Sequence, residues 1–335
     1  MKDFLYVSLQ TDNCILRFTL RGGVPEDRAV FVLEGGPAPM AANPAKTRLF
    51  AGLRKSFELA SLRIGPEGDL SLAGKIDLPG DACFVESDKS GRYIFSAYYN
   101  AGQIAVHRLE DDDSLREVQR ITTERKAHSV RLDRDNRFAY ALHTGPNKIY
   151  LYQFDSAAGL LRPRDPPWIS PGGNPEPRHS CFHPSLDCLY VLHEAGNTLS
   201  VYDFDRRSGG ITCKQTVSTL PDGGHKGSTG AELRVSGDGR FLYASNRGHD
   251  SIVCFRIDQQ SGCAERVAFT PVTATPRSFD LSPDGAFLYV AGQSSGELAA
   301  YARDRNSGAL SEIYREFIGN CPMWVMSLAL PAVRA

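Results

Sequence analysis

The chain has 335 residues, of which 41% are hydrophobic and 23% are charged, and its 38 lysines and arginines nearly balance its 39 aspartates and glutamates. A net charge of −1 provides no overall positive field for a polyanion, and this composition excludes a disordered or collagen-like chain. The chain is longer than those that usually fold around a single hydrophobic core. It should therefore form either two domains or one repetitive architecture.

A short motif recurs along the whole chain, with the order of a turn, an aromatic strand, a short loop and an alternating strand. In chain order the copies are FLYVSLQTDNCILRFTL, NPAKTRLFAGLRKSFELASLRI, SDKSGRYIFSAYYNAGQIAVHRL, DRDNRFAYALHTGPNKIYLYQFD, HPSLDCLYVLHEAGNTLSVYDFD, SGDGRFLYASNRGHDSIVCFRID and SPDGAFLYVAGQSSGELAAYARD. The aromatic that marks the strand recurs at spacings of 44, 45, 45, 50, 53 and 46 residues, at Tyr6, Phe50, Phe95, Tyr140, Tyr190, Tyr243 and Tyr289. Seven copies of this period are typical of a β-propeller.

Each repeat has room for four short strands and for no long amphipathic helix. The first copy begins at its second strand, and the matching first strand, CPMWVMSLAL, occurs only near the C-terminal end. We therefore predict an all-β, seven-bladed β-propeller with four antiparallel strands per blade, in which residues 321–330 complete the blade begun by residues 4–20. Residues 1–335 would then form a single domain, because two sandwiches would repeat irregularly and a β-helix would have a much shorter period.

The N-terminal segment MKDFLYVSLQTDNC breaks its apolar run early, and no stretch approaches the roughly 20 apolar residues that span a bilayer. Eight cysteines are scattered without a CxxC pair, which argues against a disulfide framework or a structural zinc site. We expect a cytoplasmic protein whose thiols are reduced and mostly buried, and which binds neither membranes nor nucleic acid.

We looked for candidate site residues at equivalent positions of the repeats where the residue type differs from one copy to the next. The first and second strands of a blade are antiparallel, so the start of one and the end of the other lie on the same face of the propeller. Four residues beyond each marker aromatic, the side chains are Gln10, Arg54, Tyr99, Thr144, Glu194, Arg247 and Gln293. At the start of the first strand they are His128, Arg178, Ala231 and Arg277, with Met40, Cys83 and Met323 in the remaining blades.

Each of these residues alone has an ordinary structural explanation, such as a solvated rim arginine or a buried histidine. The convergence of a carboxylate, an imidazole and guanidinium groups on one mouth of the central tunnel favours a functional site. Three other motifs are weaker candidates. The glycine-rich segment 223–229 lacks the residue order of a phosphate-binding loop, and the acidic run 110–113 fits a solvated turn. The spacing of His179 and His183 is not that of a metal-binding pair.

The chain resembles the seven-bladed propeller lactonases, a family of bacterial 6-phosphogluconolactonases and fungal carboxymuconate cyclases. The resemblance spans the whole length and is carried by AYYNAGQIAV, AHSVRLD, PEPRHSCFHP, SNRGHDSI, TPRSFDLSPDG and CPMWV. It implies a lactone hydrolase of the pentose phosphate pathway with no metal or other cofactor, whose catalytic residues fall on His128, Glu194, Arg178 and Arg277. Arg54, Tyr99, Arg247, Gln293 and Trp324 are the expected substrate-binding residues. The segment HTGPNK (143–148) departs from the Asp-Gly-type loop of many relatives.

Lactone hydrolysis needs a water molecule, a base to take its proton and a stabilised oxyanion. Either Glu194 or His128 can supply the base, and we favour Glu194, with His128 as its partner or as the proton donor to the leaving oxygen. Arg178 and Arg277 can hold the oxyanion or an anionic group of the substrate. Two alternatives stay open, a cyclase that closes lactones and a propeller that only binds a partner. We expect a small anionic lactone as the ligand and a monomer or weak homodimer.

Overall fold

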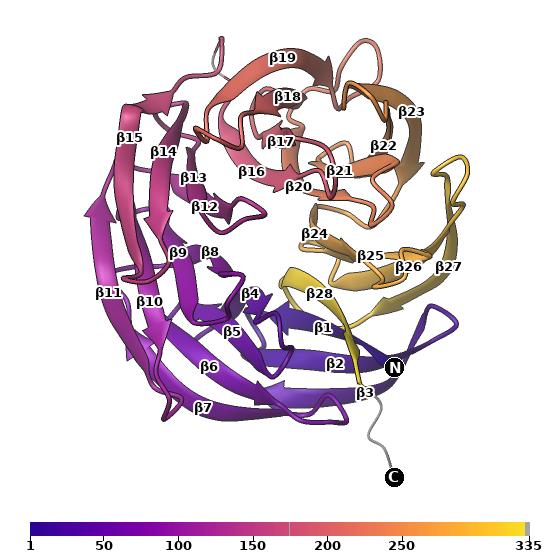
Figure 1. The fold of residues 1–335 in the computed structure, drawn as a ribbon. Coiled ribbons are helices and arrows are strands. Elements are labelled where there is room, and N and C mark those ends of the chain that lie inside the picture. The colour runs from indigo at the N-terminus through magenta and orange to yellow at the C-terminus, as the bar shows by residue number, and fades with distance from the viewer. Residues whose placement is uncertain (174, 332–335) are drawn as a thin grey trace.

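The computed structural model describes residues 1–173 and 175–331 and contains 28 β-strands, which form seven four-stranded antiparallel sheets. The sheets are arranged as blades around a central axis (Figure 1), which confirms the predicted seven-bladed propeller. Within these residues, no helix is long and apolar enough to cross a membrane.

The innermost strand of each blade runs along the central axis. These strands are β28 (Pro322–Leu330), β4 (Pro37–Ala42), β8 (Ala82–Ser87), β12 (Ala127–Leu132), β16 (Pro177–Phe182), β20 (Thr229–Val235) and β24 (Pro276–Leu281). The second strands contain the marker aromatics and are β1 (Lys2–Leu9), β5 (Arg48–Leu53), β9 (Tyr93–Tyr98), β13 (Phe138–His143), β17 (Cys188–His193), β21 (Phe241–Arg247) and β25 (Phe287–Gly292).

The two outer strands of each blade complete the sheets. The third strands are β2 (Cys14–Arg21), β6 (Glu58–Ile64), β10 (Gln103–Leu109), β14 (Lys148–Asp155), β18 (Thr198–Phe204), β22 (Ser251–Ile257) and β26 (Glu297–Arg303). The outermost strands are β3 (Val24–Val32), β7 (Leu70–Asp77), β11 (Leu115–Thr122), β15 (Leu160–Ile169), β19 (Ile211–Ser218), β23 (Ala264–Pro271) and β27 (Leu310–Phe317).

The ring closes through the two ends of the chain. Strand β28 pairs antiparallel with β1 from Lys2 opposite Leu330 to Leu9 opposite Pro322. Figure 1 shows the yellow C-terminal strand beside the indigo N-terminal strand, in the same sheet as β2 and β3. The predicted closing role of residues 321–330 is therefore confirmed.

Four of the five marker tyrosines join neighbouring blades through their hydroxyl groups. The hydroxyl of Tyr190 donates to the carbonyl of Gly262 at 2.8 Å, in the outer hairpin of the next blade. Tyr6, Tyr140 and Tyr243 make the same bond to Gly68, Gly209 and Gly308. At Gly262 the φ is +71°, and a Cβ would lie 2.4 Å from the Cys188 sulfur, so only glycine fits there. In these four blades the repeated tyrosine thus makes a contact with the next blade.

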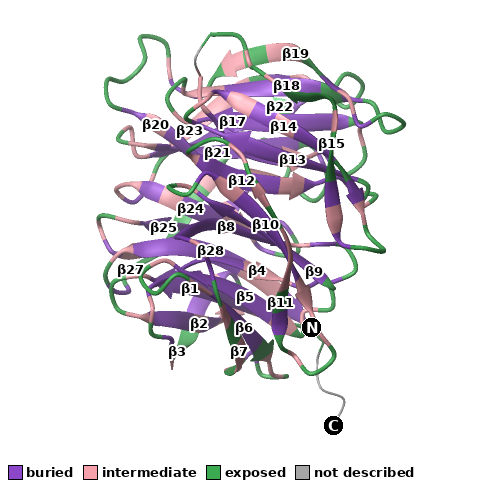
Figure 2. Cartoon of the chain, turned by 90° about the vertical axis from the view of Figure 1, so that its left-hand side faces the viewer, coloured by how far each residue is buried: buried purple, intermediate pink, exposed green. Residues whose placement is uncertain are grey.

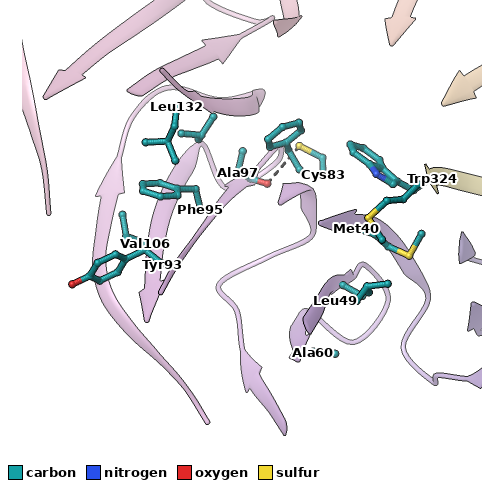
Figure 3. Close-up of a cluster of buried hydrophobic side chains, with 14 of the residues drawn as sticks. Met40, Leu49, Ala60, Cys83, Tyr93, Phe95, Ala97, Val106, Leu132 and Trp324 are labelled. Atoms are coloured by element: carbon teal, nitrogen blue, oxygen red, sulfur yellow. Dashed lines mark hydrogen bonds between the residues drawn. The ribbon is translucent and has the colours of Figure 1, made fainter. Parts of the chain in front are cut away.

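Buried side chains are concentrated in the inner strands. Figure 2 shows buried residues along β1 and exposed residues along β3 and β7, in keeping with their burial patterns. Near the axis, Met40, Cys83 and Trp324 belong to one hydrophobic cluster and come from three different strands (Figure 3). All eight cysteines are free, and only Cys213 is exposed.

Candidate active site

A β-bulge lies near the start of every innermost strand. The pairing of β16 with β17 passes from Pro177 directly to His179, so Arg178 is left out of the ladder. His128, Arg277, Cys83 and Met323 are skipped in the same way in their strands. A bulge redirects the side chain of its extra residue. The sequence register therefore located, in most blades, the residues that the fold removes from regular pairing.

Two blades differ from this pattern. In β20 the ladder passes from Gly230 to Leu233, so both Ala231 and Glu232 are skipped. In β4 it passes from Pro37 to Met40, so the bulged residues are Ala38 and Pro39. Our placement of Met40 at the mouth was wrong. Ala41 pairs with the marker Phe50 as Cys181 pairs with Tyr190, so the residue equivalent to Arg178 is Ala38, which lines the cavity.

Backbone hydrogen bonds bring the two sets of candidate residues to the same mouth. The N–H of Glu194 donates to the carbonyl of Glu176 at 2.8 Å, two residues before Arg178. The N–H groups of Thr144, Gln293 and Gln10 donate in the same way to Lys126, Thr275 and Cys321. All four acceptor residues have a positive φ, between 54° and 63°, which turns the chain sharply into the innermost strand.

Three arginines from three blades meet at the axis. Arg54, Arg178 and Arg277 line a cavity of about 10 Å³, together with Cys83, His179, Met323 and Trp324. This is close to the volume that one water molecule needs. A sugar-sized ligand would therefore lie above the arginines at the mouth, with only a small group reaching between them.

Glu194 is held between two guanidinium groups. Its Oε1 accepts a hydrogen bond from Nη2 of Arg247 at 2.6 Å, and its Oε2 lies 3.5 Å from Nε of Arg178. Burial raises the pKa of Glu194, but Arg178 and Arg247 lower it more, so the net pKa lies below its usual value. Glu194 is ionised at neutral pH and neutralises part of the arginine cluster.

The cluster has more positive than negative charge. Arg54 is paired with Asp81 at 2.5 Å, and Asp81 also accepts from Nδ2 of Asn100. In the described part of the chain, Arg277 has neither an ion pair nor a side-chain hydrogen bond, and burial followed by repulsion from Arg178 lowers its pKa to about 9. Four arginines against the carboxylates of Glu194 and Asp81 leave two positive charges at the mouth.

His128 is a neutral, unpartnered imidazole beside this cluster. It is 4% exposed, and its Nδ1 is buried without a hydrogen-bond partner among the residues described. Its ring packs edge-on against Tyr99 at 5.7 Å and against His179 at 5.0 Å, between ring centroids. Burial, and then the positive charge of Arg178, hold the pKa of His128 well below its usual value.

Comparison with known proteins places this architecture in a family. The family model described as lactonase, 7-bladed beta-propeller, matches residues 4–327. A 6-phosphogluconolactonase of Enterobacter sp. (strain 638) is 32% identical over 293 residues, which are 87% of this chain and 88% of that protein. The chain belongs to the lactonase family of seven-bladed β-propellers.

Solved structures agree with this lactonase-family fold. The Pseudomonas aeruginosa periplasmic gluconolactonase superposes with a TM-score of 0.89 at 25% identity, covering 99% of this chain and 100% of that one. A protein from Lactobacillus plantarum superposes with a TM-score of 0.88 at 23% identity, over 98% of this chain and 100% of that one, and supports the fold alone.

The structure brings most of the predicted site residues of this lactonase-family propeller together. Arg178, Arg277, Arg54 and Trp324 line the cavity, and Glu194 joins Arg178 to Arg247. The remaining predicted residues lie around the cavity: Tyr99 against His128, and Gln293 with its Nε2 3.4 Å from the sulfur of Met323. Their chemical roles stay predictions.

Sequence reasoning missed two residues of the site. His179 was considered only as a metal ligand and Glu232 was not selected, yet His179 lines the cavity and its Nδ1 lies 3.0 Å from Oε1 of Glu232. The adjacency of His179 to Arg178 was a weak signal, and Glu232 lies at the equivalent position of its own blade, one residue beyond the positions that we compared. Within residues 1–173 and 175–331, no group of three or more His, Cys, Asp or Glu side chains could hold a metal ion.

Proposed function

We propose that this chain hydrolyses a lactone that carries an anionic group, with 6-phospho-D-glucono-1,5-lactone as the substrate and 6-phosphogluconate, an intermediate of the pentose phosphate pathway, as the product. The observation that carries the proposal is Arg277, a guanidinium with no counter-ion among the described residues, at a cavity with surplus positive charge. Arginine binds phosphate and carboxylate through two parallel hydrogen bonds, and a partly buried unpaired charge gains most from such a ligand.

The relatives support the reaction class and leave the substrate to be tested. The curated relative from Enterobacter is named for the phosphorylated lactone, whereas the Pseudomonas structure is a gluconolactonase. The two differ in the phosphate group, which is the group that Arg277 would bind. We therefore assign Arg277 to the anionic group, and Arg178, which is anchored next to Glu194, to the carbonyl oxygen.

The contacts favour His128 as the base. Glu194 is engaged by Arg178 and Arg247 and has a lowered pKa, so it suits the task of holding the two arginines better than that of taking a proton. His128 is neutral, and its ring makes no side-chain hydrogen bond with the described residues. An anionic substrate bound to Arg178 and Arg277 would offset the charges that depress the His128 pKa, so substrate binding itself would strengthen this base.

The proposed reaction requires only water and side chains of this chain. A water molecule gives a proton to His128 while its oxygen bonds to the lactone carbonyl carbon, and Arg178 stabilises the resulting oxyanion. Collapse of the tetrahedral intermediate breaks the bond to the ring oxygen, which takes the proton from the His128 imidazolium. The product is the open-chain hydroxy acid, whose carboxyl group loses its proton to solvent.

The test is a lactone panel in a pH-indicator assay, with freshly prepared glucono-1,5-lactone and its 6-phosphate at equal concentrations and the Arg277→Ala variant as the matched control. We expect the phosphorylated lactone to be preferred by about tenfold or more in kcat/KM, and inorganic phosphate to compete. Equal rates on both lactones in the parent and the variant would exclude an anionic substrate. No acceleration of either hydrolysis, with closure of an unsaturated dicarboxylate instead, would favour the cyclase.

We also propose a cytoplasmic protein that acts on a small molecule as a monomer or weak homodimer, without nucleic-acid or membrane partners. The net charge of −1 and the eight unpaired cysteines support this. Sedimentation at micromolar concentration should give a mass near the 36.7 kDa of one chain, and a stable larger species would contradict it.

A further inference from the structure

A line of buried charged and polar groups continues from Arg178 into the propeller. His179 follows Arg178 in β16, and its Nδ1 lies 3.0 Å from Oε1 of Glu232 in the neighbouring blade. Both residues are 1% exposed. A carboxylate and an imidazole withdrawn from water at this depth require a specific reason, because burial of either group without partners is costly.

The carboxylate determines the tautomer of the imidazole. Glu232 has a pKa that burial raises but that Arg234 and His179 lower more strongly, so it is ionised and accepts a hydrogen bond from Nδ1–H of His179. Burial lowers the pKa of His179 to about 4, so the ring is neutral and Nε2 carries a lone pair. Nε2 lies 3.4 Å from Nη1 of Arg178 and can only accept from it.

Both protons on Nη1 of the Arg178 guanidinium have an acceptor in the protein. Nη1 of Arg178 also donates to the backbone carbonyl of Ala231, so its two protons are directed to His179 and Ala231. Nε lies 3.5 Å from the Glu194 carboxylate. Among the described residues, Nε has this ion-pair contact but no hydrogen bond, and Nη2 has neither, which leaves this end of the fork for a bound ligand.

Glu232 is itself held by residues of its own strand, which are braced by the next two blades. Its Oε1 accepts from Nη1 of Arg234 at 2.6 Å and from the N–H of Leu233 at 3.0 Å. Nε of Arg234 donates to Asp280, whose second oxygen accepts from the N–H of Ser327 in the ring-closing strand. The support for Arg178 therefore extends over three blades and does not depend on one flexible side chain.

We propose that the buried Glu232–His179 pair positions Arg178, by holding its Nη1 through the imidazole and by supplying a negative charge behind it. The role in turnover rests on the proposed function, since Arg178 is the group assigned to the developing oxyanion. His179 is a positioning residue, because it acts through Arg178. Second-layer groups of this kind set the orientation of the groups that touch the substrate.

The negative charge of Glu232 also helps to keep Arg178 protonated. Burial, and then Arg247, lower the pKa of Arg178 to about 10, whereas Glu194 and Glu232 raise it. The other titratable groups around it are His128, His179, Arg277 and the Cys83 thiol. Replacement of Glu232 by glutamine removes one of two nearby negative charges, so the Arg178 pKa should fall below that of the parent.

A substitution series at His179 separates positioning from simple packing. His179→Asn keeps a donor for Glu232 but ends short of Arg178, whereas His179→Gln places its carbonyl oxygen near the position of Nε2. We expect about a tenfold lower kcat in His179→Asn, with KM little changed, and substantial recovery in His179→Gln. His183→Gln is the matched control, since His183 is also buried, directly follows β16 and bonds to Gly239 in the neighbouring blade.

A second readout does not depend on turnover. NMR of the arginine side chains reports both the Arg178 pKa and the rate of rotation about its Cζ–Nε bond. Rotation should accelerate in His179→Asn and slow again in His179→Gln, and Glu232→Gln should lower the Arg178 pKa. Equal rotation rates and equal kcat in His179→Asn and His179→Gln, or a loss of kcat that follows the loss of thermal stability, would overturn the proposal. A parent protein without lactone turnover would refute the proposed function, and the NMR result would still decide whether Arg178 is positioned this way.

Discussion

The Nη2 atom of Arg247 lies 2.6 Å from Oε1 of Glu194, although the two residues belong to neighbouring blades. The other oxygen of the same carboxylate faces Nε of Arg178 at 3.5 Å. One half-buried carboxylate thus links two like-charged side chains that would otherwise repel each other. Its net pKa shift is downward because these arginines outweigh burial, so it keeps this role throughout the neutral range.

Removal of that carboxylate should disorder the arginine cluster. Glu194→Gln keeps the shape of the side chain but removes its charge, so Arg178 and Arg247 lose their shared counter-ion. We expect turnover to fall by roughly 100-fold, with thermal unfolding changed little, as measured by steady-state kinetics and calorimetry. Parent-like turnover in this variant would contradict the assignment, and Glu58→Gln, at a surface ion pair with Lys75, serves as the control.

His128 should determine the acid limb of the pH profile. Its pKa is lowered by burial and then by Arg178, so the neutral imidazole persists below pH 6.5. We therefore expect kcat/KM to stay constant from pH 8 down to about 6.5 and to fall only in more acidic buffer. His128→Ala should lower kcat by about 100-fold or more at pH 7. An acid limb centred above pH 7, or an unaffected alanine variant, would exclude His128 as the base.

Arg277 should govern affinity for the anionic group. Arg277→Lys keeps a positive charge but cannot form two parallel hydrogen bonds, so KM for the phosphorylated lactone should rise about tenfold. Arg277→Ala should raise KM further and reduce the difference between the phosphorylated and plain lactones. Arg116→Ala, which removes a surface partner of Glu110, is the control and should leave both parameters unchanged. An unchanged KM in Arg277→Lys would show that this residue does not clamp the substrate.

Acid should destabilise the fold through its buried histidines. Burial lowers the pKa of six of the eight histidines: His107, His128, His143, His179, His183 and His193. A lowered folded-state pKa means that the unfolded chain binds protons first as pH falls, so stability is complete above pH 6.5 and decreases towards pH 4.

The corresponding measurement is thermal unfolding at pH 7.5 and pH 5. We expect the midpoint to be lower at pH 5 by about 5 °C or more, because each such histidine costs up to about 1.4 kcal/mol per pH unit in this range. His107→Gln removes one of these groups and should make the pH dependence shallower. Equal midpoints at the two pH values would show that the histidines are protonated without penalty in the folded protein.

Loss of the closing strand should open the ring. Deletion of residues 321–335 removes β28, which pairs with β1 over its whole length. We expect an aggregating or molten product, judged by near-UV circular dichroism and gel filtration, because β1 then becomes an exposed edge strand. A permuted chain that starts in the loop at residue 34 and joins the original ends by a linker keeps every strand and should fold. A cooperative unfolding transition in the truncated chain would contradict the prediction.

Much of the propeller could be predicted because its signals are local and repeated. The marker aromatics and the turns between the strands recur in blade after blade, so their spacing indicated seven blades. The missing strand of the first copy indicated closure by residues 321–330. His128, Arg178, Glu194 and Arg277 could be selected for the same reason, since single-residue bulges recur at equivalent positions of the repeats.

Only the tertiary structure decided which charges meet. Glu232 and His179 occupy equivalent positions of neighbouring blades, and only the packed structure brings Nδ1 of His179 to 3.0 Å from Oε1 of Glu232. The division of the arginines into anchored Arg178, paired Arg247 and unpaired Arg277 depends on side chains from different blades. The sequence determined the repeat because the repeat reflects backbone geometry, whereas the ion pairs depend on distances between blades that no local pattern contains.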